Sequence, residues 1–444
     1  MDSKKRLQSL DILRGFMILY VIFLHAIIQR VFCSQGAEFE TTVNNVPLFF
    51  ALLVSPIILM SIWGPIFTFM GGIAAGYNLG NVMDADSTEI ARKTKVRFAN
   101  NLMLFLIAKL DLFLFSGRTS DHIYTTHSLV TGSLETGQFT MPEFLHLFTN
   151  STLESMAISG MLLSLLLYWL ATKKRRVHHS EQIAKKLVIL GIFVLLVAEF
   201  FRVYLTEQDV FAIKEILWEN KSFLNYALFL RLYASRFAVF PVFAFSLFGG
   251  SLGVLIAGGV SFGKFARWTF GLGIGLVGVF VASFIHGFDM IGTYADELLP
   301  MQMQCLNLGL MMILFGGLYY WFDVRTTPVK KTKLRTFFRK YSNLSMTIYI
   351  LEGFIAQSWY LVFYIAHRGP FSDNLPLIIT YLATVLATWQ IIIKLWTKIS
   401  NRGSFEWLMQ KGRNKILNLN QNKRWKQYRI YSPQITKRKL VLNY

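Results

Sequence analysis

The chain has 444 residues, of which 54% are hydrophobic and only 16% are charged. This balance is too apolar for a soluble protein of this length and is typical of proteins that cross a membrane several times. Basic residues exceed acidic residues by 20. In a membrane protein such an excess marks cytoplasmic loops, so it does not indicate nucleic-acid binding. The two cysteines form no C-x-x-C motif and predict no metal site.

The first apolar stretch, residues 6–32, is long enough to cross a bilayer but carries Asp11, Arg14 and His25. At about 100° per residue of helix, these three side chains lie within about 60° of arc. Ionisable groups inside a membrane are costly and usually face the protein interior at a functional site. We therefore predict that this face of the helix lines a site, with His25 about 16 Å deeper than Arg14.

Each of these residues also has a structural interpretation. Ser9 is a candidate N-cap, and Asp11 in the first turn suits the positive end of the helix dipole. Arg14 is spaced to pair with Asp11 at i,i+3 or to extend to the membrane surface. His25 lies well inside the span, where it is either functional or a packed histidine with satisfied hydrogen bonds.

The chain as a whole predicts an all-α fold, a polytopic helical bundle in the membrane with about ten transmembrane helices. Breaks at Pro56 and at Trp63-Gly64-Pro65 divide the second apolar run into a short re-entrant helix and the true span. Residues 1–397 form the bundle, and residues 398–444 form a basic C-terminal tail. The predicted spans are 9–32, one within 46–80, 96–116, 152–171, 186–205, 233–257, 268–286, 302–322, 342–366 and 374–397.

The distribution of basic residues predicts the orientation of this bundle. With the N-terminus in the cytoplasm, 34 of the 45 lysines and arginines fall on the cytoplasmic side and six on the opposite side. This asymmetry predicts that both termini are cytoplasmic and that the protein lies in a membrane, most simply the cell membrane. No cleavable signal peptide is evident, because the first apolar run is too long and no A-x-A-like site follows it.

Several segments outside the spans have recognisable patterns. Residues 206–231 predict an amphipathic helix on the outer surface. Cys33 and Cys305 both fall at the outer face, and whether they pair is left open. Residues 398–444 carry twelve basic residues and one acidic residue. This tail either lies against anionic lipid headgroups or is disordered chain whose charge sets the topology.

Other charged residues within the predicted spans differ in spacing. Lys109 and Asp111 are two residues apart, so they do not share a helix face. Asp111 remains a candidate polar residue of an intramembrane site. Glu199 and Arg202 are three residues apart, which predicts a structural ion pair.

The opening motif resembles the signature of the transmembrane acyltransferase superfamily, which includes the acyltransferase-3 proteins and heparan-α-glucosaminide N-acetyltransferase. The first span of that family typically reads R-x-x-S-L-D-x-x-R-G, followed by an apolar run that ends in His or Asn. The matching residues here are Arg6, Ser9, Leu10, Asp11, Arg14, Gly15 and His25. A histidine at the last position is similar to the acyltransferase-3 pattern.

Later segments are similar to the family in kind. Residues 64–72 resemble its F-x-F-x-x-G run, residues 236–241 its F-P element, and residues 344–351 its S-L-T-x-Y-L element. Glu352 departs from the pattern, because relatives usually have a histidine there. Arg236 and Glu352 are each isolated within a predicted span, so the sequence identifies them as candidate site residues whose partners are unknown.

The resemblance implies transfer of an acyl group, often acetyl, from cytoplasmic acyl-coenzyme A to a hydroxyl or amine of a glycan or lipid-linked acceptor. It implies His25 and Asp11 as catalytic residues, acyl-coenzyme A as co-substrate and no permanently bound cofactor. Neutral imidazole suits the role of general base near pH 7. A polyanionic donor needs cations at the cytoplasmic face, although basic loop residues there also fit plain membrane topology. The candidate donor-binding residues are Arg14, Arg97, Lys264 and Arg267.

The alternative function is a membrane transporter or flippase for a lipid-linked or small polar substrate. Buried charges would then line a substrate path. We find no pair of interrupted helices at matching positions in two halves of the chain, which disfavours this alternative. Membrane lipids are expected partners in either case, and a homodimer is left open.

Overall fold

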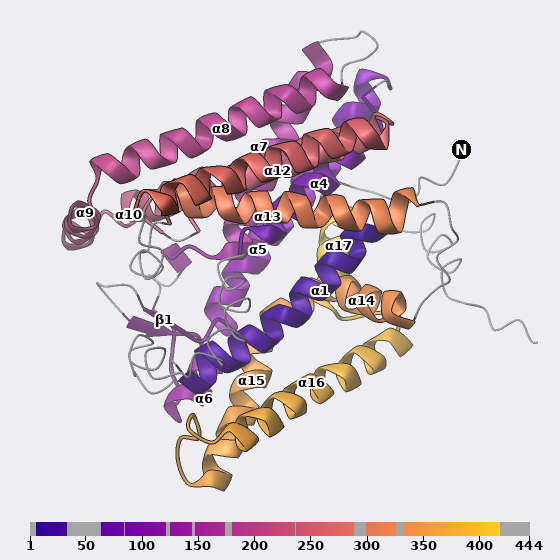
Figure 1. The fold of residues 1–444 in the computed structure, drawn as a ribbon. Coiled ribbons are helices and arrows are strands. Elements are labelled where there is room, and N and C mark those ends of the chain that lie inside the picture. Colours follow the sequence, from indigo (N-terminus) through magenta and orange to yellow (C-terminus); the bar gives the residue numbers. More distant parts are fainter. Residues whose placement is uncertain are drawn as a thin grey trace, which may run out of the picture.

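The computed structural model describes residues 6–32, 64–83, 85–120, 125–143, 147–173, 180–235, 237–287, 299–325 and 333–417. The described residues form an all-α bundle, as predicted (Figure 1). Their one β-structure is a short antiparallel pair, in which Arg118 of β1 lies opposite His127 of β2. The elements in chain order are α1 (Gln8–His25), η1 (Ala26–Phe32, a π-helix), α4 (Ile66–Gly80), α5 (Ser87–Leu114), β1 (Arg118–Ser120), β2 (Thr125–His127), α6 (Val130–Thr136), α7 (Thr152–Lys173), α8 (Ser180–Tyr204), α9 (Glu207–Glu219), α10 (Phe223–Leu232), α11 (Val239–Ala257), α12 (Phe262–Ile285), α13 (Met301–Tyr319), η5 (Tyr320–Val324, a π-helix), α14 (Lys333–Asn343), α15 (Ser345–His367), α16 (Leu375–Lys398) and α17 (Phe405–Ile416).

Each predicted span coincides with a helix or a helix–π-helix pair. Eight of these are long and apolar enough to cross a membrane: α1, α7, α8, α11, α12, α13 with η5, α15 and α16. The other two are α4 and α5. Helix α4 covers only the end of the predicted 46–80 run, whose residues before 64 lie outside the described part of the chain. Helix α5 has 28 residues, and its first turns are charged.

Helix α1 joins two hydrophobic clusters of the bundle. Leu13 and Met17 pack into a cluster formed with α4, α7, α8, α11 and α13. Ile18 and Ile22, further along α1, pack into a second cluster formed with α14, α15 and α16. Figure 1 shows α1 between the group that contains α8, α12 and α13 and the group that contains α14, α15 and α16. The change from one cluster to the other falls between Met17 and Ile18, so the end of α1 lies within the second cluster.

Segments predicted outside the spans are also helical. Helices α9 and α10 occupy the predicted 206–231 segment, and a capping box between Thr206 and Asp209 starts α9. The predicted tail contains α17, which packs against α5 and α15. This part of the tail is therefore a docked helix, while residues 418–444 lie outside the described part of the chain.

Helices α4 and α11 approach closely because glycines line both faces. A Cβ added at Gly76 would lie 2.1 Å from the carbonyl oxygen of Gly250. A Cβ added at Gly249 would lie 2.1 Å from the carbonyl oxygen of Phe69 on the other helix. Small residues at such an interface allow backbones to pack without intervening side chains, as is common between membrane helices.

We expect Gly76→Val to destabilise the bundle, because the new side chain would meet the α11 backbone. Overpacking of this kind typically costs about 1–3 kcal/mol. Gly71→Val on the same helix is the matched control, because a Cβ there meets nothing within 4 Å. Thermal unfolding in detergent should show a lower midpoint for Gly76→Val only. Equal midpoints for the two variants would contradict this packing account.

Candidate functional site

The candidate site is centred on a contact between His25 and Glu352. Nδ1 of His25, the last residue of α1, lies 2.5 Å from Oε1 of Glu352 on α15. The Glu352 side chain is 7% exposed and the His25 side chain is 22% exposed. A carboxylate at Nδ1 holds the ring proton there and leaves Nε2 as the free acceptor. The sequence left the partner of Glu352 unknown, and the structure places it 327 residues away in the chain.

Further polar groups surround this pair. Tyr349, one helical turn before Glu352, packs edge-on against the His25 ring with centroids 6.5 Å apart. Asp111 of α5 is buried and close enough to Glu352 to interact with it electrostatically. Oε2 of Glu352 is fully buried and has no hydrogen-bond partner among the described residues. Buried polar atoms are usually satisfied, so an unpartnered carboxylate oxygen indicates a group that awaits a proton, a water or a substrate.

A second polar cluster begins five residues after His25. Arg30, in the π-helix η1, forms a buried ion pair with Glu135 of α6. Its guanidinium also donates to Gln357 Oε1 on α15 at 3.2 Å, and His127 lies 3.4 Å from Glu135 Oε2. Nothing in the sequence singled out Arg30, Glu135 or Gln357 as site residues, so this cluster was not predicted. Short π-helical segments are frequent at functional sites, but no pattern in the sequence indicated η1.

Arg14 and Arg97 lie together at the other end of α1. Their guanidinium groups are close enough to repel each other. Arg97 donates to the backbone carbonyls of Ala74 and Gly71 on α4, whereas its Nε is buried without a partner among the described residues. Arg14 makes no hydrogen bond or ion pair in the same part of the chain. Two adjacent cations with unused donors form an arrangement suited to an anion.

Asp11 is not part of the His25–Glu352 site, although its charge attracts that of Arg14. Its carboxylate bonds to Arg6, with Nη2–Oδ1 at 2.7 Å, so the i,i+3 pairing with Arg14 does not form. It also lies about 21 Å along the helix axis from His25, because fourteen residues separate them. Ser9 does not cap α1. Both carboxylate oxygens of Asp323 accept from the backbone N–H groups of Gln8 and Ser9, each at 2.9 Å.

Two other candidate donor-binding residues lie at the surface of α12. Lys264 pairs with Glu181 of α8 at 2.5 Å, and both side chains are well exposed. Arg267 is exposed on the same helix. The structure therefore brings Arg14 and Arg97 together but does not bring either of these two residues into that pair.

Two ion pairs elsewhere hold helices together. Glu154, fully buried on α7, accepts from Lys109 of α5 at 2.5 Å and from Arg231 of α10. Lys109 and Asp111 thus point to different partners, as their spacing predicted. The predicted Glu199–Arg202 pair is confirmed, with Nη2–Oε1 at 2.8 Å.

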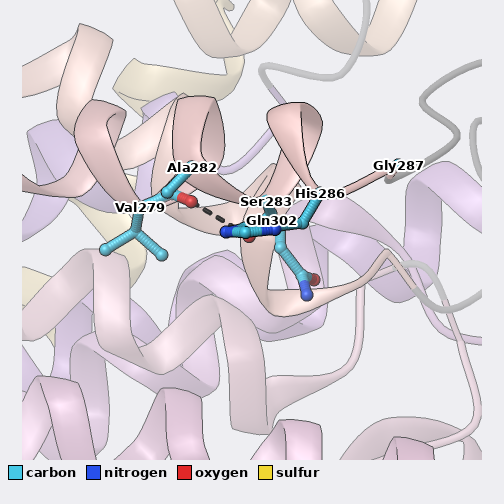
Figure 2. Close-up of a pocket in the computed structure, with 6 residues that line it drawn as sticks. All are labelled: Val279, Ala282, Ser283, His286, Gly287 and Gln302. Carbon is cyan, nitrogen blue, oxygen red and sulfur yellow. Dashed lines mark hydrogen bonds between the residues drawn. The ribbon is translucent and has the colours of Figure 1, made fainter.

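A separate hollow of about 580 Å³ lies at the end of α12 (Figure 2). Figure 2 shows Ser283 and His286 of this region beside Gln302 of α13, with Val279 one helical turn before Ser283. The backbone N–H of His286 donates to the carbonyl of Ala282 at 3.2 Å, which is an ordinary helix-end bond. The hollow contains none of the predicted site residues.

Some predictions fall outside the described residues. Arg236 is one of them, and Cys33 is another, while Cys305 is a buried free thiol. Within the described part of the chain, no group of three or more His, Cys, Asp or Glu residues is placed to hold a metal ion. No protein-family model, curated protein or solved structure matches the chain. Its function must therefore be inferred from its own residues and their geometry.

Proposed function

We propose that the protein is an integral membrane acyltransferase that moves an acyl group, most simply acetyl, from acyl-coenzyme A to a hydroxyl or amine acceptor. The observation that carries this proposal is the buried His25–Glu352 contact at 2.5 Å. A histidine whose Nδ1 is held by a carboxylate is the general base of many acyl-transfer sites. Here it lies inside a membrane helix, where an ionisable pair is costly and therefore usually marks a functional site.

The chemistry follows from the free Nε2 atom. Nε2 accepts the proton of the acceptor O–H or N–H as that atom attacks the thioester carbonyl. The new acyl–oxygen or acyl–nitrogen bond forms and the carbon–sulfur bond breaks. His25 then returns the proton to the departing thiolate, which leaves as the coenzyme A thiol. Glu352 stabilises the imidazolium that exists between these two proton transfers.

The Arg14–Arg97 pair is suited to hold the donor. Coenzyme A carries phosphates, and guanidinium groups bind phosphate through paired hydrogen bonds. With both termini in the cytoplasm of a cell-membrane protein, this pair lies on the cytoplasmic side of His25. About 16 Å of helix separates Arg14 from His25, a span that the pantetheine arm would cover. The acceptor, a glycan or lipid-linked molecule, would approach from the opposite side.

We expect Arg14→Ala to weaken binding of acetyl-coenzyme A by roughly 10- to 100-fold, because a charge-assisted hydrogen bond is lost. The melting temperature should change little, because Arg14 makes no hydrogen bond or ion pair among the described residues. The charges around it both attract it, from Asp11 and Glu406, and repel it, from Arg6 and Arg97. Calorimetry on purified protein measures the affinity. Arg339→Ala, which removes an exposed arginine from α14, is the matched control. Unchanged affinity in folded Arg14→Ala protein would assign Arg14 a structural role.

A transporter or flippase is the second candidate. The buried ion pair between Arg30 and Glu135 favours it, because such pairs often line substrate paths in membrane proteins. The two functions differ in their products. Purified protein in vesicles should release coenzyme A thiol in the presence of an acceptor if it is an acyltransferase. Movement of substrate across the vesicle membrane without thiol release would favour the transporter.

A further inference from the structure

Helix α17 is tied to the first turn of α15, the helix that carries Tyr349 and Glu352. Glu406 Oε1 accepts from the backbone N–H groups of Met346 and Thr347 at 2.7 and 3.1 Å. The Phe405 N–H donates to Thr347 Oγ1 at 2.9 Å. A carboxylate at a helix N-terminus satisfies otherwise unpaired N–H groups and meets the positive end of the helix dipole. The start of α17 is thus hydrogen-bonded to the bundle.

The same helix also rests on α5. Arg413 Nη1 donates to Asn100 Oδ1 at 3.3 Å. A Cβ added at Gly412 would lie 2.5 Å from the Met103 side chain, so the two helices touch there. Helix α17 therefore bridges α5 and α15, the two helices that carry Asp111 and Glu352.

Helix α5 itself presents an exposed apolar face. Leu102, Leu106 and Leu110 are 37%, 53% and 43% exposed, and their i, i+4, i+8 spacing places them on one face. An exposed apolar stripe on a helix of a membrane bundle is the surface that contacts lipid. Helix α17 thus rests on a helix that itself contacts lipid.

The outward face of α17 combines apolar and cationic side chains. Leu408 and Ile416 are 44% and 51% exposed, and Lys411 and Lys415 are also exposed. These four residues follow the i, i+3, i+7, i+8 spacing of a single helix face. Lys411 Nζ lies 5.0 Å from the centre of the Trp407 ring. A helix face of this composition is typical of helices that lie in the membrane interface.

We propose that α17 binds anionic phospholipid headgroups through Lys411 and Lys415, with Leu408 and Ile416 entering the apolar boundary. Charge complementarity supports a phospholipid surface, because residues 418–444 add seven basic residues and no acidic residue. The exposed apolar side chains of Leu408 and Ile416 beside the lysines support a lipid rather than a soluble anion. Through Glu406 and Arg413, this binding holds α15 and α5 in place.

Hydrogen–deuterium exchange on the full-length protein in lipid nanodiscs tests the proposal. The amides of α17 are compared in phosphatidylcholine alone and in phosphatidylcholine mixed with phosphatidylglycerol. We expect the anionic lipid to slow exchange by roughly five-fold for each lysine engaged. High salt should remove this difference, since it shortens the range of surface charge interactions.

Two double variants make the test specific. K411Q/K415Q should lose the lipid-dependent protection, whereas K185Q/K186Q, which removes two exposed lysines from α8, should retain it. Unchanged exchange in the buried helix α11 verifies that each variant is folded. Equal exchange of wild-type α17 in the two lipids would overturn the proposal, as would full protection in K411Q/K415Q. Protection by a soluble polyanion in phosphatidylcholine alone would also overturn it. Because exchange requires no turnover, the result is independent of acyl transfer.

Discussion

Replacement of His25 by alanine is expected to reduce acyl transfer by about 10²- to 10⁴-fold, the usual effect of removing a general base. Folding and acetyl-coenzyme A binding should remain near normal, because the ring is 22% exposed and Arg14 and Arg97 are untouched. The rate of acceptor-dependent thiol release measures the effect. His286→Ala is the matched control, because His286 is exposed at the end of α12.

The variant His25→Asn separates two roles for this position. Asparagine retains a hydrogen-bonding side chain but cannot take a proton near neutral pH. If His25 is the base, His25→Asn should be as slow as His25→Ala. Activity retained by asparagine would mean that the side chain orients the substrate. Near-normal turnover in His25→Ala would instead leave His25 as a packing residue.

The second large effect is expected for Glu352→Gln. The glutamine amide keeps the shape of the side chain but can donate to Nδ1, which would favour the proton on Nε2 and remove the free base. In serine-protease triads the equivalent acid-to-amide change lowers turnover by about 10⁴-fold. We expect a loss of roughly 10²-fold or more here, with little change in donor affinity.

A control separates this effect from a general loss of charge. Glu181→Gln removes a carboxylate from the exposed pair with Lys264 and should leave the rate unchanged. Surface pairs of this kind contribute little to stability, so the control should also fold normally. Normal turnover in Glu352→Gln would mean that the carboxylate is not needed for proton transfer by His25.

The sequence predicted the helices well because length and hydropathy are local properties. Helices occur at all the predicted spans, and the divergence of Lys109 from Asp111 follows from helix geometry alone. The Glu199–Arg202 pair was predictable for the same reason, since both residues lie on one helix. Helix periodicity also indicated that His25 lies on a polar face of α1.

Partners on other helices were not predictable, because a single sequence contains no information about which helices are neighbours. The Glu352 partner of His25 is 327 residues away, and Arg30 is paired across 105 residues with Glu135. Local rules also failed where a distant residue intervened. Asp323 took the capping role expected of Ser9, and it lies more than 300 residues from the start of α1.

The most direct test of the proposed pair is a double-mutant cycle on acceptor-dependent thiol release. The rates of wild-type, His25→Ala, Glu352→Gln and the double variant are compared in the same vesicles. If Glu352 acts through His25, the double variant should be no slower than His25→Ala alone, because residues that act as a unit are strongly non-additive. Losses that multiply in the double variant would contradict the account, because they would show that the two residues act independently.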